Sequence, residues 1–191
     1  MFITIPNTLT WLRILAIPLI VVLFYLPYTW ARPAAGLAFA IAGITDSLDG
    51  YLARKLNQVS RLGAFLDPVA DKLIVAVALV LLVGSDPRML LVFCAIVIIG
   101  REIAISALRE WMAELGQRTK VAVSSVGKLK TILQIVGLSM LLYEQNLFGL
   151  PLYRLGLLLT AVAAVLTLLS MFLYLRAAWP ELRGAAVRED T

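Results

Sequence analysis

Four aspartates gather in the first half of the chain, in the segment ITDSLDGYLARKLNQVSRLGAFLDPVADK. They are Asp46, Asp49, Asp67 and Asp71. The first two are three residues apart and the last two are four apart, so each pair projects from one face of a helix. Four converging carboxylates cannot all stay ionised without cations, because burial and mutual repulsion drive protons back onto them. We therefore expect all four to bind two divalent ions, magnesium or manganese, as in two-metal phosphoryl-transfer sites.

Small residues and one arginine accompany the acids. The small residues are Gly50, Ala53 and Gly63. They leave open surface on the helix faces that carry the acids, so that a bulky ligand can approach the backbone and the metals. Arg54 lies a little over two helical turns from Asp46 and is placed to bind a phosphate or one of the acids. The alternative is that the aspartates only join helices through ion pairs with Arg54, Arg61 and Lys72, although a single pair would suffice for that.

The composition predicts that these residues lie in an integral membrane protein. Hydrophobic residues make up 61% of the 191 residues and charged residues only 15%, which is beyond the range of soluble domains. The length leaves room for one domain, spanning 1–191. The chain has no histidine, so its chemistry must use carboxylates, lysine, arginine or bound metal. The single cysteine, Cys94, lies in an apolar run and is expected to be a small buried side chain.

Six apolar stretches approach the ~20 residues that a helix needs to cross a bilayer. They cover about 8–28, 33–55, 64–83, 89–111, 126–143 and 155–176. We expect an all-α membrane protein with six transmembrane helices, its first span retained because no cationic region with a cleavage site precedes it. The polar tail from Trp179 onward is expected to be a frayed, solvated end.

The basic residues predict the orientation, because six spans place both termini on one side. Only Arg32, Arg88 and Arg154, of 17 lysines and arginines, fall on the other side. By the positive-inside rule both termini are therefore cytoplasmic, which accounts for the net charge of +5 without nucleic acid. Asp46 lies nine residues, about 14 Å of helix, before Lys55. The acids are thus expected at the level of the cytoplasmic headgroups.

A basic cluster is expected on the same cytoplasmic side. Arg101 and Arg109 are eight residues apart on the fourth span, hence on nearly one face, and Lys128 and Lys130 begin the fifth. Arginine can donate two parallel hydrogen bonds to a phosphate, and lysine adds a point charge. Together they suit the binding of a phosphate dianion that does not itself react. Membrane topology or snorkelling alone would equally explain Lys130, as it would Arg118 and Lys120.

Polar residues also mark the start of the first span, where Asn7, Thr10 and Arg13 are spaced three apart on one face. Asn7 is alternatively a helix cap, and Thr10 a hydroxyl bonded within the helix. Arg13 lies about a turn and a half into an apolar helix and is harder to explain in that way.

The spacing Asp46-x2-Asp49-Gly50-x2-Ala53-Arg54-x8-Gly63-x3-Asp67-x3-Asp71 resembles at every position the signature of the CDP-alcohol phosphotransferases. The resemblance implies six transmembrane helices, a homodimer, and a polar cavity open to the cytoplasm and sideways to lipid. It implies that the first three aspartates hold the metals and contact the donor diphosphate. It further implies that Asp71 is the general base.

The resemblance extends beyond that motif. The strings IPNTLTWLRI, GREIAISALREWMAELG and VGKLKT resemble family members that join CDP-diacylglycerol to glycerol 3-phosphate and release CMP. The donor would then contact Asn7, Thr10, Arg13, Asp49, Gly50, Ala53, Arg54 and Gly63. Glycerol 3-phosphate would contact Arg101, Arg109, Lys128 and Lys130.

Two other functions remain open at the level of sequence. A sibling enzyme that uses inositol phosphate, phosphatidylglycerol or serine as acceptor would share every donor-site residue. A divalent-cation transporter would also place acids in a membrane, but near the midplane and with a path across both leaflets. For the enzyme we expect direct in-line transfer, since a covalent intermediate needs a nucleophile that is free of metal.

Overall fold

The computed structural model describes the backbone of residues 5–56, 61–114 and 125–189, and the side chains of 10–46, 66–112 and 129–176. This part of the chain is all-α. The helices are α1 (Ile5–Tyr25), α2 (Ala31–Leu56), α3 (Arg61–Ser85), α4 (Met89–Glu114), α5 (Ser125–Tyr143) and α6 (Leu152–Glu189). Each overlaps one of the six expected apolar stretches, so the expected all-α chain with six helices in this order is confirmed, whereas the six membrane spans stay a prediction.

The last helix differs from its predicted end. We expected it to stop near residue 176 and the tail to fray, but α6 continues to Glu189. That prediction was wrong, because polar composition ends a membrane span without ending a helix. The tail segment ELRGAAVRE is rich in alanine, leucine, arginine and glutamate, all of which favour helix.

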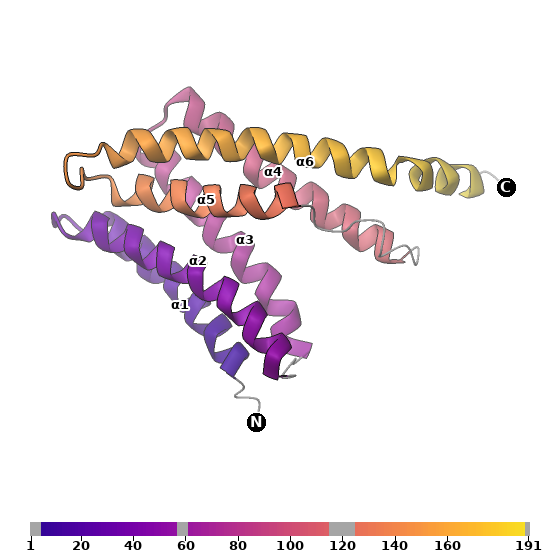
Figure 1. Ribbon diagram of the computed structural model, residues 1–191, viewed down its shortest axis with the longest axis horizontal. Helices are drawn as coiled ribbons and strands as arrows, with labels where there is room; N and C mark the ends of the chain where they lie inside the picture. Colours follow the sequence, from indigo (N-terminus) through magenta and orange to yellow (C-terminus); the bar gives the residue numbers. More distant parts are fainter. Residues whose placement is uncertain (1–4, 57–60, 115–124, 190–191) are drawn as a thin grey trace.

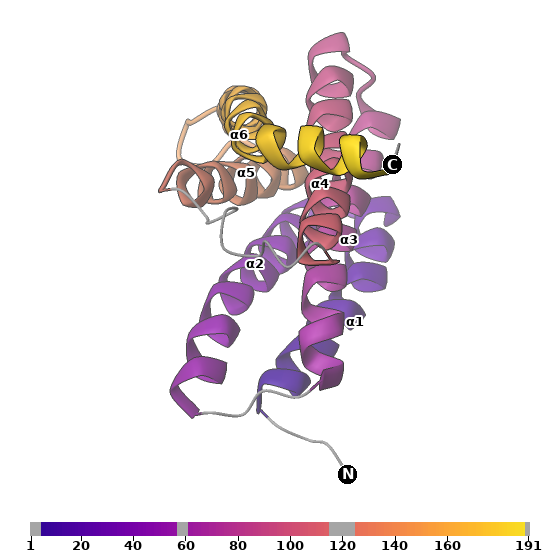
Figure 2. The same cartoon turned by 90° about the vertical axis from the view of Figure 1, so that its right-hand side faces the viewer.

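The six helices form two arms that diverge from a common end (Figure 1 and Figure 2). Helices α1–α3 make one arm and α4–α6 the other, and the three short loops between α1 and α2, α3 and α4, and α5 and α6 lie together where the arms meet. Arg32 pairs with Glu144 at 3.0 Å there, and the Tyr153 hydroxyl donates to Asp86. These contacts, together with the packing of α2 against α5, hold the arms together toward this end, and the arms lie apart at the other end.

Glycines allow the helices to pack closely near this junction. A Cβ added to Gly36 on α2 would lie 2.7 Å from the Ser139 carbonyl oxygen on α5. Gly137 and Gly156 play the same part between α5 and α6, where a Cβ at Gly156 would lie 2.8 Å from the Gly137 carbonyl oxygen. Close backbone approach through small residues is typical of helices that pack within a membrane.

The outer surface of the bundle is apolar. Large hydrophobic side chains are exposed along the helices, among them Leu12, Leu15, Leu19, Phe93, Ile96, Val165 and Phe172. Within the described residues, Met89–Met112 and Leu152–Arg176 are long and apolar enough to cross a bilayer. Exposed apolar surface of this extent is typical of a protein that contacts lipid or a partner. Cys94 is buried in the core, as predicted.

Candidate active site

A cavity of about 200 Å³ is lined by polar residues from both arms. Its charged and amide-bearing lining includes Arg13, Asp46, Asp71, Glu102, Lys130 and Gln134. Two of the acids predicted to bind metal, Asp46 and Asp71, and one residue of the basic cluster predicted to bind phosphate, Lys130, thus face one space.

The acidic side of this cavity is organised by α1. One guanidinium nitrogen of Arg13 lies 2.9 Å from an Asp46 oxygen and 2.7 Å from an Asp71 oxygen. One turn earlier on α1, the Thr10 hydroxyl donates a hydrogen bond to Asp67. We call these five residues, Thr10, Arg13, Asp46, Asp67 and Asp71, the acidic network. In it, two carboxylates share a single buried guanidinium.

Helix geometry explains how this network forms. Thr10 and Arg13 are three residues apart on α1, and Asp67 and Asp71 are four apart on α3, so two matching faces meet where α1 packs against α3. The ion-pair partner of the acids is thus Arg13, which was not among the cations considered for a purely structural role. Burial of an arginine inside an apolar helix requires such an anion.

The donor set of the acidic network fits hard divalent cations. Oxygens of Asp46 and Asp71 already converge on one point of positive charge, and every donor is a carboxylate or hydroxyl oxygen. Such ligands suit magnesium or manganese better than zinc. Three or more acidic, histidine or cysteine side chains do not gather around one point within the described residues, which exclude the side chain of Asp49.

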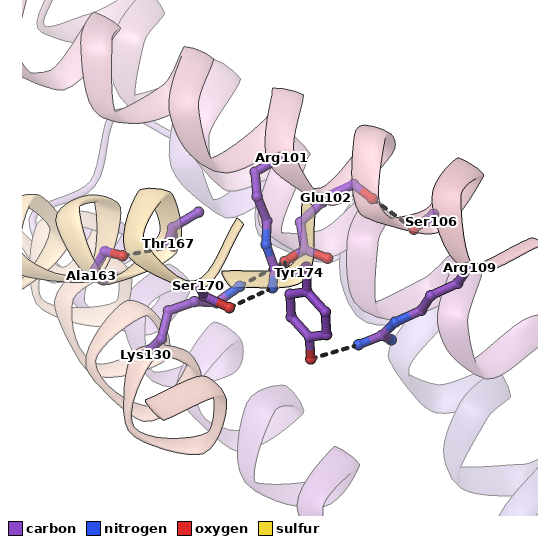
Figure 3. A network of polar contacts seen from close by, with 9 residues as sticks. All are labelled: Arg101, Glu102, Ser106, Arg109, Lys130, Ala163, Thr167, Ser170 and Tyr174. Carbon is purple, nitrogen blue, oxygen red and sulfur yellow. Dashed lines mark hydrogen bonds and ion pairs between the residues drawn. The ribbon is translucent and has the colours of Figure 1, made fainter. Parts of the chain in front are cut away.

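The basic side of the cavity centres on Glu102 (Figure 3). One Glu102 oxygen accepts a hydrogen bond from Arg101 at 2.8 Å and another from Lys130 at 2.9 Å. Arg101 also donates to the Ser170 hydroxyl at 3.2 Å. The side chains of Arg101 and Lys130 are 7% and 4% exposed, so both cations are buried. A single carboxylate therefore balances two buried cations.

Tyr174 on α6 adds Arg109 to this group. Arg109 donates to the Tyr174 hydroxyl at 3.3 Å, and the guanidinium carbons of Arg101 and Arg109 lie 5.7 Å and 5.6 Å from the ring centroid. Figure 3 shows the ring reaching from α6 toward both arginines. Such contacts are attractive cation–π interactions. We call Arg101, Glu102, Arg109, Lys130, Ser170 and Tyr174 the basic network.

The structure brings together eight of the predicted site residues in these two networks: Thr10, Arg13, Asp46, Asp67, Asp71, Arg101, Arg109 and Lys130. The side chains of the others lie outside the described residues; these are Asn7, Asp49, Gly50, Ala53, Arg54, Gly63 and Lys128. The roles predicted for them stay predictions.

Five polar residues of the site escaped sequence reasoning: Glu102, Thr131, Gln134, Ser170 and Tyr174. The first gave a signal, because Glu102 directly follows Arg101 at the end of an apolar run and an acid there needs a cation. Gln134 is four residues after Lys130, hence on the same helix face. Ser170 and Tyr174 have the same spacing, but a serine or tyrosine in an apolar helix is too common to single out.

Comparison with known proteins confirms the resemblance found in the sequence. Residues 3–176 match the sequence model of the CDP-alcohol phosphatidyltransferase family. The CDP-diacylglycerol–glycerol-3-phosphate 3-phosphatidyltransferase of Salmonella choleraesuis is 53% identical over 174 residues, 91% of this chain and 94% of the relative. The protein of the same name from Escherichia coli is 52% identical over 178 residues, 93% and 96% of the two chains. The chain belongs to the CDP-alcohol phosphatidyltransferase family.

Proposed function

We propose that this enzyme transfers the phosphatidyl group of CDP-diacylglycerol to glycerol 3-phosphate, giving phosphatidylglycerol phosphate and CMP. The single observation that carries the proposal is the cavity lined by Asp46 and Asp71 from one arm and by Lys130 and Glu102 from the other. One side suits the cations that a diphosphate requires, and the other suits the unreactive phosphate of the acceptor. The names and high identity of the relatives support this choice of substrates.

The acidic network is the donor side. Asp46, Asp49, Asp67 and Asp71 would hold two magnesium or manganese ions, which when bound neutralise the diphosphate and its developing charge. Thr10 and Arg13 hold and orient the carboxylates by the contacts already described. Together with Asn7, Gly50, Ala53, Arg54 and Gly63, they border the CDP-diacylglycerol.

The transfer step is a direct in-line displacement. Asp71 accepts the proton of the primary hydroxyl of glycerol 3-phosphate, and that oxygen bonds to the phosphorus that bears the diacylglycerol. The bond from this phosphorus to the bridging oxygen of the diphosphate breaks, and CMP leaves with the electron pair. Positioning of the substrates and stabilisation of charge supply most of the rate acceleration, because phosphoryl transfer does not require the protein to form covalent bonds to the substrate.

The basic network is the acceptor side. Arg101, Arg109, Lys128 and Lys130 bind the phosphate of glycerol 3-phosphate, with arginine donating two parallel hydrogen bonds and lysine a point charge. The burial of Arg101 and Lys130 supports this role, since a buried cation interacts more strongly with an anion than an exposed one does. Glu102 holds both cations in place until the phosphate arrives.

The surroundings of the enzyme belong to the same proposal. The apolar outer surface and the three loops gathered at one end support a multi-pass protein of the bacterial inner membrane, with six spans. The distribution of lysine and arginine puts both termini and the cavity mouth on the cytoplasmic side. As the family resemblance implies, the enzyme acts as a homodimer whose cavity also opens sideways to lipid.

The test follows CMP release by the purified protein with CDP-diacylglycerol and a panel of acceptors. We expect rapid release with glycerol 3-phosphate and very slow release with glycerol, serine or inositol phosphate. Chelation should abolish the activity, and magnesium or manganese should restore it where zinc does so poorly. If the enzyme prefers inositol phosphate or serine, the family assignment stands but glycerol 3-phosphate is the wrong acceptor.

A further inference from the structure

Gln134 on α5 is buried, polar and incompletely bonded. Its side chain is 5% exposed, and its carboxamide oxygen has no hydrogen-bond partner among the described residues. A buried polar atom without a partner costs free energy, so native proteins rarely retain one without a reason. Gln134 also lines the cavity to which both networks contribute residues. A ligand that enters this cavity can therefore supply the missing hydrogen bond.

A second buried and incompletely bonded group shows why the position matters. The Thr160 hydroxyl on α6 also has no hydrogen-bond partner among the described residues. It faces Gly137 across the contact between α5 and α6, where a Cβ on Gly137 would lie 2.7 Å from it. Thr160 does not line the cavity. Its hydroxyl thus belongs to helix packing, whereas the Gln134 carboxamide borders the space that a substrate would occupy.

The neighbours of Gln134 indicate what kind of ligand it meets. Lys130 is one helical turn earlier on the same face of α5, about 5 to 6 Å away between Cβ atoms. Asp71 lines the same cavity from α3. A small acceptor with its phosphate at Lys130 and its reacting hydroxyl at Asp71 has one polar group left, the hydroxyl on the carbon between them.

We propose that Gln134 is a specificity-determining residue whose carboxamide accepts a hydrogen bond from the middle hydroxyl of the acceptor; this rests on the proposed function. The last torsion of a glutamine side chain is soft, so the carboxamide turns to present its oxygen at little cost. An acceptor without the middle hydroxyl leaves the carboxamide unpaired in a buried site. Sites of this kind reject analogues that lack the hydrogen-bonding group.

The experiment compares two acceptors, glycerol 3-phosphate and the monophosphate of 1,3-propanediol, which lacks only the middle hydroxyl. CMP release at saturating donor gives kcat/KM for each acceptor. We expect the wild type to favour glycerol 3-phosphate by roughly ten- to a hundredfold. Gln134→Met has similar size but cannot form the hydrogen bond. It should bring the two acceptors within about threefold of each other, by losing activity on glycerol 3-phosphate alone.

Thr160→Val is the matched control, because it removes a buried hydroxyl outside the cavity, and it should keep the wild-type preference. Equal loss of activity on both acceptors in Gln134→Met would indicate a merely structural role and overturn the proposal. So would an unchanged preference in that variant. If Gln134→Met does not fold, kcat/KM of the wild type for the two acceptors still tests the proposal. Equal values for both acceptors would refute the role of Gln134 and leave the proposed function standing. No CMP release with glycerol 3-phosphate would refute both.

Discussion

In the acidic network Asp46 and Asp71 share one nitrogen of Arg13, whereas in the basic network Arg101 and Lys130 share one oxygen of Glu102. The two arrangements mirror each other, with two like charges held around one opposite charge. When all its groups are ionised, each of these trios therefore has an excess of one sign, negative on the donor side and positive on the acceptor side. Such excess is costly to bury unless a ligand of the opposite charge completes it.

The comparison suggests a common design for two different ligands. Arg13 and Glu102 each act as an internal counter-ion that holds like charges together before the substrates arrive. In the proposed function, ligands then complete the balance, with cations on one side and a phosphate on the other. The two networks should consequently respond to mutation in different ways, although both contribute residues to the same cavity.

The largest effect is expected in the acidic network. Asp67→Asn keeps the size of the side chain and a hydrogen-bond acceptor for Thr10, but removes a charge from the proposed metal ligands. Turnover should fall by several orders of magnitude, because affinity for hard cations depends on ligand charge. CMP release by variant protein that is shown to be inserted and folded provides the measurement. Near-normal turnover would show that the acids do not bind catalytic metal.

In the basic network the effect should be smaller and confined to one substrate. Arg101→Gln removes one of the proposed charge-assisted contacts to the acceptor phosphate, worth ~1.5 to 3 kcal/mol, or roughly ten- to a hundredfold. The loss should appear in kcat/KM for glycerol 3-phosphate, with the KM for CDP-diacylglycerol nearly unchanged. Lys120→Ala serves as the control and should change neither value. An equal weakening of both substrates would remove the distinction between the two networks.

Glu102→Gln tests the counter-ion directly. Two buried cations lose their shared carboxylate, so the melting temperature should fall by a few degrees in the absence of substrate. Added inorganic phosphate should restore more stability to the variant than it adds to the wild type, because the anion takes over the role of the carboxylate. Thermal unfolding with and without phosphate measures both effects. A variant as stable as the wild type would mean that Glu102 does not balance these charges.

The smallest effect is expected where the arms join. Arg32 and Glu144 are paired at 3.0 Å, but their side chains are 22% and 48% exposed. Exposed pairs contribute ~0.2 to 1 kcal/mol, so Glu144→Gln should lower the melting temperature only slightly. CMP release should be unchanged, because this pair is at the loop end and does not line the cavity. A large loss of activity would show that the loop end controls the site.

The sequence predicted the helices well because each is an apolar run bounded by glycine, proline or polar residues. It also predicted which residues of one helix share a face, as with Arg101 and Arg109. Both features are local, since they depend only on spacing along the chain. The continuation of α6 to Glu189 was missed because the length of an apolar run does not determine where a polar helix ends.

Residue spacing along the chain could not predict which side chains on different helices contact each other. A buried Arg13 predicts that an anion lies nearby, but not that Asp46 and Asp71 provide it, because the choice depends on which helices pack together. Glu102 was visible as an acid at the end of an apolar run, yet its contact with Lys130 requires the fold to bring α4 within side-chain reach of α5. Gln134 was missed because a single amide in an apolar helix gives no hint of a cavity.

The separation of the two networks is tested most directly by a crossed binding measurement. Manganese, followed by electron paramagnetic resonance, and glycerol 3-phosphate, followed by calorimetry, are each titrated into the wild type, Asp67→Asn and Arg101→Gln. We expect Asp67→Asn to lose manganese binding while it retains glycerol 3-phosphate, and Arg101→Gln to retain manganese while it binds glycerol 3-phosphate roughly ten- to a hundredfold more weakly. If either variant loses both ligands, or if both variants bind both ligands as the wild type does, the assignment of one network to each ligand is wrong.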